Sequence, residues 1–355
     1  MADRQLLKEL TEAFGPSGYE TEPAAILVRE LSRVGEVTRD GLGSVICRVA
    51  GRSERPRVMI SAHMDEVGFL VKAVTGDGYV RFLPIGGWWP QVLLGQRVVL
   101  RTRKGDFTGV IGSKPPHELT DEERKKLPDI NTMFMDFGCR DGLDLVKETG
   151  LRRGDPVVPV CPFSEMAGGL LMAKAWDDRG GCGMLVELAR RLGKGRFPGT
   201  LFLVGSAQEE VGLRGARTAA EVVKPDVALA LDVSLCGEYP DRSRKDVEER
   251  LGNGAAILVH DMSMIPNTRL RDFAIGAAES AKARFHLTTV RGGYDTGAIH
   301  LTGGGVPSLA VGWPTRYIHS HTGIVAEEDY DSVVGLTAAV IERLDAAAAE
   351  SIRSF

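Results

Sequence analysis

The segment Val58-Met59-Ile60-Ser61-Ala62-His63-Met64-Asp65-Glu66 is an apolar run of strand length that ends in an imidazole and two carboxylates. Such a run, bounded by polar residues, is typical of a strand buried on both faces of a sheet. Three later apolar runs also end in residues that bind metal ions or transfer protons. They are residues 201–205, followed by Glu209 and Glu210; residues 227–231, followed by Asp232; and residues 307–314, followed by Tyr317, His319 and His321. Because ligands bind outside the carboxyl ends of strands in open α/β sheets, we expect these side chains to converge.

Segments with helical periodicity alternate with these strand-like runs. The spacing of apolar residues predicts helices at residues 4–13, 22–34, 184–192, 215–222, 268–282 and 328–349. Strands that alternate with helices predict an α/β fold with a mixed, largely parallel sheet covered by helices on both faces.

Residues 71–163 differ from the rest of the chain, because they form short β-like runs punctuated by turns. Lys104-Gly105-Asp106 has the composition of a hairpin turn between two of these runs. At about 150 residues per domain, 355 residues predict one large domain and a smaller one. We therefore predict a catalytic α/β domain at residues 1–70 and 164–355, interrupted by an inserted β-rich domain at residues 71–163.

Composition and charge exclude several classes of protein. The formal net charge of −4 gives no basic surface for nucleic acid or an anionic membrane. The amino-terminal ten residues carry charges where a secretory signal or a membrane span needs an apolar run. The five cysteines are odd in number, scattered and without a CxxC pair, which suits a reducing compartment. We expect a cytoplasmic protein without nucleic-acid or membrane partners.

Several common catalytic motifs are missing from the sequence. The chain has no GxxxxGK[ST] phosphate loop, no GxGxxG after a strand, no HExxH helix and no GxSxG elbow. These absences argue against the commonest nucleotide-binding proteins, zincins and serine hydrolases.

The residues at the strand ends suit a metal centre that performs hydrolysis. Imidazole and carboxylate ligands together bind zinc, cobalt or manganese, and an open coordination position supplies the water. Two neighbouring ions need a carboxylate that bridges them and another that takes the proton from water. Ala175-Trp176-Asp177-Asp178-Arg179-Gly180-Gly181, ahead of the predicted helix 184–192, supplies further carboxylates.

Each candidate also has an ordinary structural interpretation. Asp177 and Asp178 are suited to cap the following helix, Glu209-Glu210 to lie in a solvated loop, and His63 to be a hydrogen-bonded core histidine. Joint occurrence favours the metal centre, because only seven histidines exist and two follow predicted core strands.

The residues at these positions resemble the tetrahedral (TET) aminopeptidases, cocatalytic metallopeptidases of clan MH. The similarity runs nearly end to end, and HMDEVGF and QEEVGLRGA are its most specific parts. The matching segments are FGPSGYE (14–20), SAHMDEVGFLV (61–71), AWDDRGG (175–181), AQEEVGLRGA (207–216), ALDVS (230–234), GYDTGAIH (293–300) and PTRYIHS (314–320).

The resemblance implies a role for each candidate side chain. His63 and Asp232 would bind one metal ion, Glu210 and His319 the other, and Asp177 would bridge them. Glu209 would be the general base and later the general acid. Asp65, two residues after His63 on the predicted strand, would orient that imidazole.

The resemblance also implies an architecture and an assembly. The expected fold is a phosphorylase/hydrolase-like zinc peptidase domain with an inserted PDZ-like β domain used for dimerisation. Dimers would assemble into a tetrahedral dodecamer whose interior admits peptides or unfolded segments. The cofactors would be two divalent metal ions per subunit, zinc or cobalt, with manganese also compatible.

Two departures from the family pattern affect the site. Ser320 is followed by His321 instead of Pro and Glu, so His321 competes with His319 as a ligand, although the RYIHS frame favours His319. Tyr294 stands where many relatives have a glycine in a loop expected near the substrate, which leaves side-chain preference open.

We therefore predict a dinuclear metal aminopeptidase that removes amino-terminal residues from peptides, with metal-bound water as the nucleophile. An N-acyl deacylase or deblocking peptidase, or a carboxypeptidase of the same clan, would share the ligands and differ in how the substrate's ends are bound. A glycoside hydrolase needs no histidine-rich metal set. A non-catalytic scaffold would be expected to have lost at least one ligand.

Overall fold

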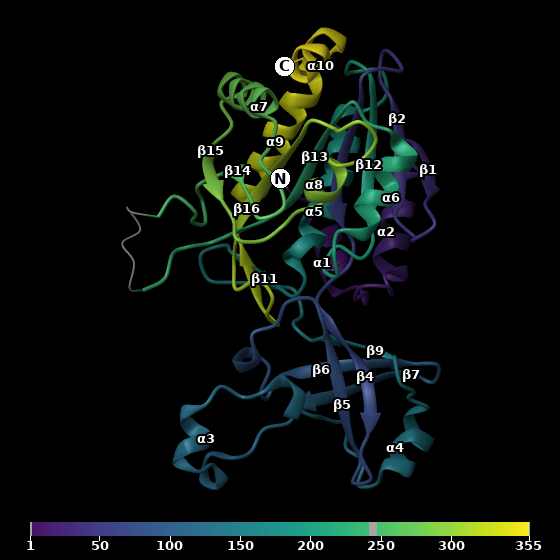
Figure 1. Cartoon of the computed structure of the whole chain (residues 1–355), viewed down its shortest axis with the longest axis vertical. Coiled ribbons are helices and arrows are strands. Elements are labelled where there is room, and N and C mark those ends of the chain that lie inside the picture. The colour runs from purple at the N-terminus through teal and green to yellow at the C-terminus, as the bar shows by residue number, and fades with distance from the viewer. Residues whose placement is uncertain (1, 241–246, 355) are drawn as a thin grey trace.

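A computed structural model describes residues 2–240 and 247–354 of the chain. An α/β part, which contains both chain ends, lies above a separate β barrel (Figure 1). The helices of the α/β part are α1 (Arg4–Glu12), α2 (Thr21–Leu31), α5 (Trp176–Leu192), α6 (Arg214–Val223), α7 (Thr268–Ala281), α8 (Thr296–Ile299), α9 (Glu327–Arg343) and α10 (Ala346–Arg353).

The large sheet is parallel at its centre and mainly antiparallel outside it. Its strands are β1 (Glu36–Arg39), β2 (Val45–Ala50), β3 (Arg57–His63), β10 (Ser164–Glu165), β11 (Leu171–Ala173), β12 (Thr200–Ser206), β13 (Val227–Leu235), β14 (Ala255–His260), β15 (Phe285–Thr289), β16 (Ser308–Arg316) and β17 (Gly323–Val325). The order is β1-β2-β12-β3-β13-β16-β17-β11-β10, with β14 on β16 and β15 on β14. The neighbours β12, β3, β13 and β16 are mutually parallel. The prediction of a mixed, largely parallel sheet is confirmed at these four central strands.

Side chains of the central strands alternate between two cores. On β3, Val58, Ile60 and Ala62 join the cluster formed with α1, α2, α5 and α9. Met59 points the other way, into the cluster formed with α6 and α8. Helices on both faces exclude water from the parallel strands, which is why these runs are almost entirely apolar.

Two helices differ from the sequence prediction. The helix expected at 184–192 begins earlier, as α5, and runs through Gly180 and Gly181. A Cβ atom at Gly180 would collide with the Trp313 ring, so this glycine permits close packing on β16. The helix expected at 328–349 is two helices, because the Asp345 side chain accepts a hydrogen bond from Ala348 N (2.8 Å) and starts α10.

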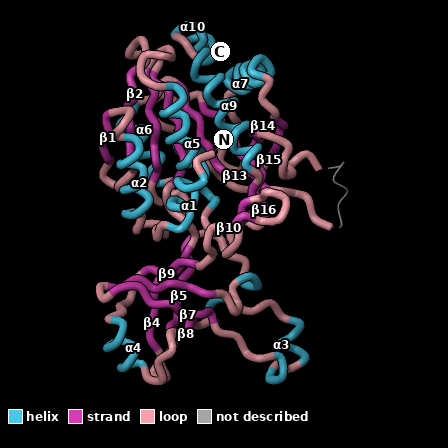
Figure 2. The backbone as a smooth tube through the Cα atoms, turned by 180° about the vertical axis from the view of Figure 1, so that it is seen from behind, coloured by secondary structure: helices cyan, strands magenta, loops and turns pink. Residues whose placement is uncertain are grey.

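The β-rich segment forms a closed six-stranded barrel, flanked by α3 (Asp121–Lys125) and α4 (Gly142–Thr149) (Figure 2). Its order is β4-β5-β8-β7-β6-β9, from β4 (Gly68–Val74), β5 (Tyr79–Ile85), β6 (Arg97–Thr102), β7 (Gly105–Ile111), β8 (Met135–Asp136) and β9 (Pro156–Pro159). The interior is filled by buried side chains, among them Phe69, Val98, Leu100, Ile111 and Val157. The chain enters the barrel after β3 and leaves it before β10.

Among the residues that the structure describes, no helix combines the length and the apolar character needed to cross a bilayer.

Candidate metal centre

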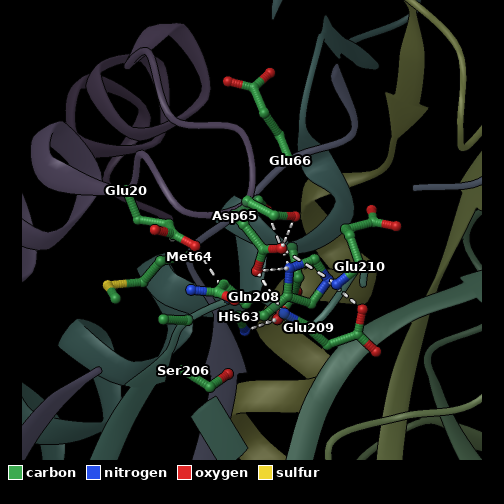
Figure 3. A network of polar contacts seen from close by, with 12 residues as sticks. Glu20, His63, Met64, Asp65, Glu66, Ser206, Gln208, Glu209 and Glu210 are labelled. Carbon is green, nitrogen blue, oxygen red and sulfur yellow. Dashed lines mark hydrogen bonds and ion pairs between the residues drawn. The ribbon is translucent and has the colours of Figure 1, made fainter. Parts of the chain in front are cut away.

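The candidate side chains gather at the carboxyl ends of the four central strands. His63 ends β3, Asp232 lies in β13, and His319 follows β16. Glu209 and Glu210 follow β12 in a loop that lies beside His63 (Figure 3). The parallel pairing of these strands brings together residues that are far apart in the sequence. This is the convergence predicted from their positions after the apolar runs.

Asp177 lies between two imidazoles. Its Oδ1 is 2.9 Å from His63 Nε2, and its Oδ2 is 3.3 Å from His319 Nε2. Each carboxylate oxygen thus faces a different histidine.

The remaining carboxylates surround this bridge. Glu210 Oε2 lies 3.6 Å from His319 Nε2. On the other side, Glu209 Oε2 and Asp232 Oδ2 lie 3.8 and 4.0 Å from His63 Nε2. The ligand atoms of His63, Asp177 and Glu210 can lie within 4.8 Å of one another, a spacing suited to one cation.

Burial makes the charges of this cluster depend on one another. Burial lowers the pKa of His319, but the hydrogen bond to Asp177 and the charge of Glu210 raise it to about 9. Burial and the charge of Asp177 raise the pKa of Glu210 to about 8. Burial likewise raises the pKa values of Glu209 and Asp232 well above the usual range. Four buried carboxylates would repel one another if all were ionised, which favours the protonated forms of Glu209, Glu210 and Asp232, and a bound cation would stabilise the ionised forms instead.

Asp177 and Asp178 have non-helical backbone angles that kink α5, and Asp178 caps the part of the helix after the kink, as predicted for either aspartate. Its Oδ1 accepts from Gly181 N and its Oδ2 from His63 N, both at 3.0 Å. Asp178 also lies within ligand distance of His63 and Asp232. Because both its oxygens already accept backbone hydrogen bonds, Asp177 is the better candidate for a cation.

Asp65 supports the site through its own carbonyl oxygen and through the backbone amides that its carboxylate binds. The Nδ1 atom of His63 is 3.0 Å from the Asp65 carbonyl oxygen and 3.5 Å from the Asp65 carboxylate. The carboxylate accepts from Glu209 N (2.9 Å) and Glu210 N (3.2 Å). Since β3 ends at His63, the alternation of side chains along the strand does not extend to Asp65, and the prediction based on it is wrong at this point.

His321 occupies a different environment from His319. It is 2% exposed, and its ring centroid lies 5.7 Å from that of Trp88. Burial lowers its pKa to about 4. His319 Nε2 lies beside Asp177 and Glu210, whereas the His321 ring packs beside Trp88, so the geometry favours His319 as the RYIHS frame does.

A cavity of about 570 Å³ opens onto the carboxylates. Apolar side chains line it beside the cluster: Leu213, Val233, Leu235, Val290 and Ile318. Gly87, from the barrel segment, and Arg291 also contribute. Tyr294 donates from its hydroxyl to Val233 O (2.9 Å) and so fixes the wall of the cavity. Most of the lining residues are not predictable from the sequence, because only tertiary packing brings them together.

Several known proteins with similar sequences and folds are named as aminopeptidases. The chain is 37% identical to the putative aminopeptidase FrvX of Escherichia coli, over 99% of this chain and 97% of that protein. It is 35% identical to the glutamyl aminopeptidase of Lactococcus lactis, over 98% of both. A TET aminopeptidase from a marine sediment Thaumarchaeota archaeon superposes with a TM-score of 0.94 at 42% identity, covering 98% of both chains. The TET1 peptidase of Pyrococcus horikoshii, which can form a tetrahedron or a large octahedral shell, gives 0.85 at 29% identity, covering 96% of this chain and 99% of that one.

The fold and these similarities define the protein as a peptide hydrolase. More particularly, the chain belongs to the M42 glutamyl aminopeptidase family, whose model matches residues 43–336. The resemblance to the tetrahedral aminopeptidases is thereby confirmed.

Proposed function

We propose that the protein is an aminopeptidase that uses two divalent metal ions to remove amino-terminal residues from peptides. The observation that carries this proposal is the position of Asp177, whose two oxygens face His63 and His319 separately. Asp232 lies beside His63, and Glu210 lies beside His319. The side chains therefore divide into two sets that share Asp177.

The chemistry of the donors fits such a pair of ions. Glu210 Oε1 is buried and has no hydrogen-bond partner, which is costly for a carboxylate oxygen unless a cation binds there. Imidazole and carboxylate donors suit zinc, cobalt or manganese.

The proposed role of each residue follows from its position. His63 and Asp232 would hold one ion, Glu210 and His319 the other, and Asp177 both. Bound ions would supply Lewis acidity and lower the pKa of water toward neutrality. Glu209, beside His63 and 11% exposed, would accept the proton from the attacking water. Glu209 would then deliver that proton to the leaving amine, while Asp65 holds its loop.

The substrate would present a free amino terminus. The carboxylates that line the cavity would accept hydrogen bonds from the α-amino group, and the apolar wall of the cavity would receive the adjoining side chain. An N-acylated substrate lacks this free amino group.

Three further parts of the proposal concern the whole protein. The barrel would be a PDZ-like dimerisation domain, inserted between the two catalytic segments 1–70 and 164–355. Dimers would form a homo-oligomer, with the tetrahedral dodecamer as the expected form; the P. horikoshii relative supports this assembly. The expected location is the cytoplasm.

The test compares aminoacyl-p-nitroanilides with their N-acetylated counterparts. Chelator-stripped protein is assayed with and without added zinc, cobalt or manganese. Metal-dependent cleavage confined to free amino termini is expected. Cleavage of the acetylated substrates would instead identify a deacylase or deblocking peptidase, and no cleavage with any metal would contradict the proposal.

A further inference from the structure

Three consecutive backbone amides in the loop after β12 donate to carboxylates from other parts of the chain. Gln208 N donates to Glu20 Oε1 at 3.0 Å. Glu209 N and Glu210 N donate to the two oxygens of Asp65 at 2.9 and 3.2 Å. Figure 3 shows Glu20 and Asp65 beside this loop. The loop that carries Glu209 is therefore held through its backbone amides. The side chains of Gln208, Glu209 and Glu210 take no part in these three hydrogen bonds.

The backbone of this loop needs such support. Gln208 has a φ of +58°, in the left-handed region that non-glycine residues seldom adopt. Conformations of this kind persist only where the surroundings impose them. The amide of Gln208 is the one that Glu20 binds, so the contact lies at the strained residue.

Glu20 does not cap the helix that it precedes. It is the residue before α2, where a side chain usually caps the helix, yet it makes no capping hydrogen bond. It is 8% exposed, and its Oε1 accepts from Gly18 N (2.8 Å) as well as from Gln208 N. A buried carboxylate is costly, and burial together with the charge of Asp65 raises its pKa. The position of Glu20 is explained by the loop that it holds.

Ser17 supports the same loop through Asp65. Its hydroxyl donates to Asp65 Oδ2 at 2.6 Å, on the oxygen that also accepts from Glu210 N. Ser17 lies in a turn closed by Tyr19 N donating to Pro16 O (2.8 Å), with Gly18 at a φ of +87°. From this turn, Glu20 binds the Gln208 amide directly, and Ser17 binds the Asp65 oxygen that accepts from the Glu210 amide.

We propose that Ser17 and Glu20 are positioning residues for the reaction, which fix the 208–210 loop and thereby set the place of Glu209. These two side chains of the amino-terminal segment 14–20 thus support the active site. This inference rests on the proposed function for the role of Glu209, and on the hydrogen bonds alone for the support of the loop.

The experiment compares Ser17→Ala and Glu20→Ala with the wild type in the full-length protein. The first measurement is hydrogen–deuterium exchange of peptides that cover residues 207–213, in chelator-treated protein. Loss of one supporting hydrogen bond is expected to speed exchange there by about tenfold, while peptides from β13 stay unchanged. The second measurement is steady-state kinetics at equal metal content. The value of kcat is expected to fall by about tenfold to a hundredfold, with KM within about twofold.

Conservative variants distinguish a positioning role of these side chains from a general loss of structure. Glu20→Gln keeps an oxygen that can accept from Gln208 N, and Ser17→Thr keeps the hydroxyl, so both should restore slow exchange and most of kcat. Tyr19→Phe is the matched control, because it removes a hydrogen bond in the same segment (Tyr19 hydroxyl to Gly154 O, 2.7 Å) that does not touch the loop.

Unchanged exchange at 207–213 in both alanine variants would overturn the proposal. The same holds if kcat is unaffected in an active enzyme, or if Glu20→Gln is as impaired as Glu20→Ala. If the wild type cleaves no aminoacyl substrate but the alanine variants exchange faster, the support of the loop stands and the aminopeptidase proposal fails.

Discussion

Lys174 and Glu66 form an ion pair in the protein interior, with Lys174 Nζ 2.7 Å from both Glu66 oxygens. The two side chains are only 6% and 1% exposed. Nζ also donates to Ala13 O (3.1 Å), and Glu66 accepts from Gly15 N (3.3 Å). The pair thus ties the residues before α5 to the amino-terminal segment that supports the active site.

Replacing Lys174 by methionine should destabilise the protein by about 3 kcal/mol, because it leaves a carboxylate buried without its principal partner. The double variant Lys174→Met/Glu66→Met should regain much of this loss, because neither charge is then left unpaired. Urea unfolding measures both, with Lys72→Met as the exposed control. A Lys174→Met protein within about 0.5 kcal/mol of the wild type would contradict the expected cost of the broken pair.

Replacing Glu209 by glutamine should lower kcat by about 10² to 10⁴ without changing the metal content, because the amide is a poor proton acceptor. The measurement is turnover of an aminoacyl-p-nitroanilide alongside elemental analysis of the same sample. Glu221→Gln, on the exposed side of α6, is the control. An active Glu209→Gln enzyme would contradict the assignment of Glu209 as the general base.

Removing the shared carboxylate should have a larger effect on metal binding than removing an unshared one. Asp177→Ala should lose both of the two expected ions, whereas Asp232→Ala should lose only one. Elemental analysis after gel filtration gives the metal stoichiometry, and circular dichroism verifies the fold. An Asp177→Ala protein that retains one ion at full occupancy would speak against a bridge.

The stability of the protein should fall between about pH 6.5 and pH 4 partly because of His321. Burial lowers the pKa of this residue to about 4, so the folded state favours the neutral ring. Its contribution to stability is fully present above the unfolded-state pKa of about 6.5 and is lost as the pH falls through about 4. The pKa difference corresponds to about 3 kcal/mol.

Urea unfolding of chelator-treated protein across this pH range measures the effect. His321→Leu should lose less stability on acidification than the wild type, and His117→Leu, at an exposed position, should behave like the wild type. Parallel pH profiles for His321→Leu and the wild type would refute this prediction.

The centre of the fold and the position of its site are predictable from local patterns. Apolar runs such as residues 58–62 are visible in the sequence because both faces of the strand are covered. His63, Asp232 and His319 are predictable because each lies at or beyond the end of such a run. Parallel pairing then requires these ends to share one edge of the sheet.

Other features depend on contacts that no local pattern records. The helix through Gly180 is set by the Trp313 ring, and the break before α10 by the side chain of Asp345. Ser17 and Glu20 support the reaction centre from a segment that resembles an ordinary turn. Their role depends on Asp65 and Gln208, which are distant in sequence and meet them only in the folded protein.

The proposed metal centre includes residues from His63 to His319, so its formation depends on how much of the chain has been synthesised. The ribosome completes domains from the amino terminus onward, and β16 must pair with β13 before His319 can approach Asp177. A nascent or prematurely terminated chain that ends before residue 319 lacks one of the two histidines. On the proposed ligand roles such a fragment would be inert, and hydrolytic capacity would arise only when synthesis of the chain is almost finished.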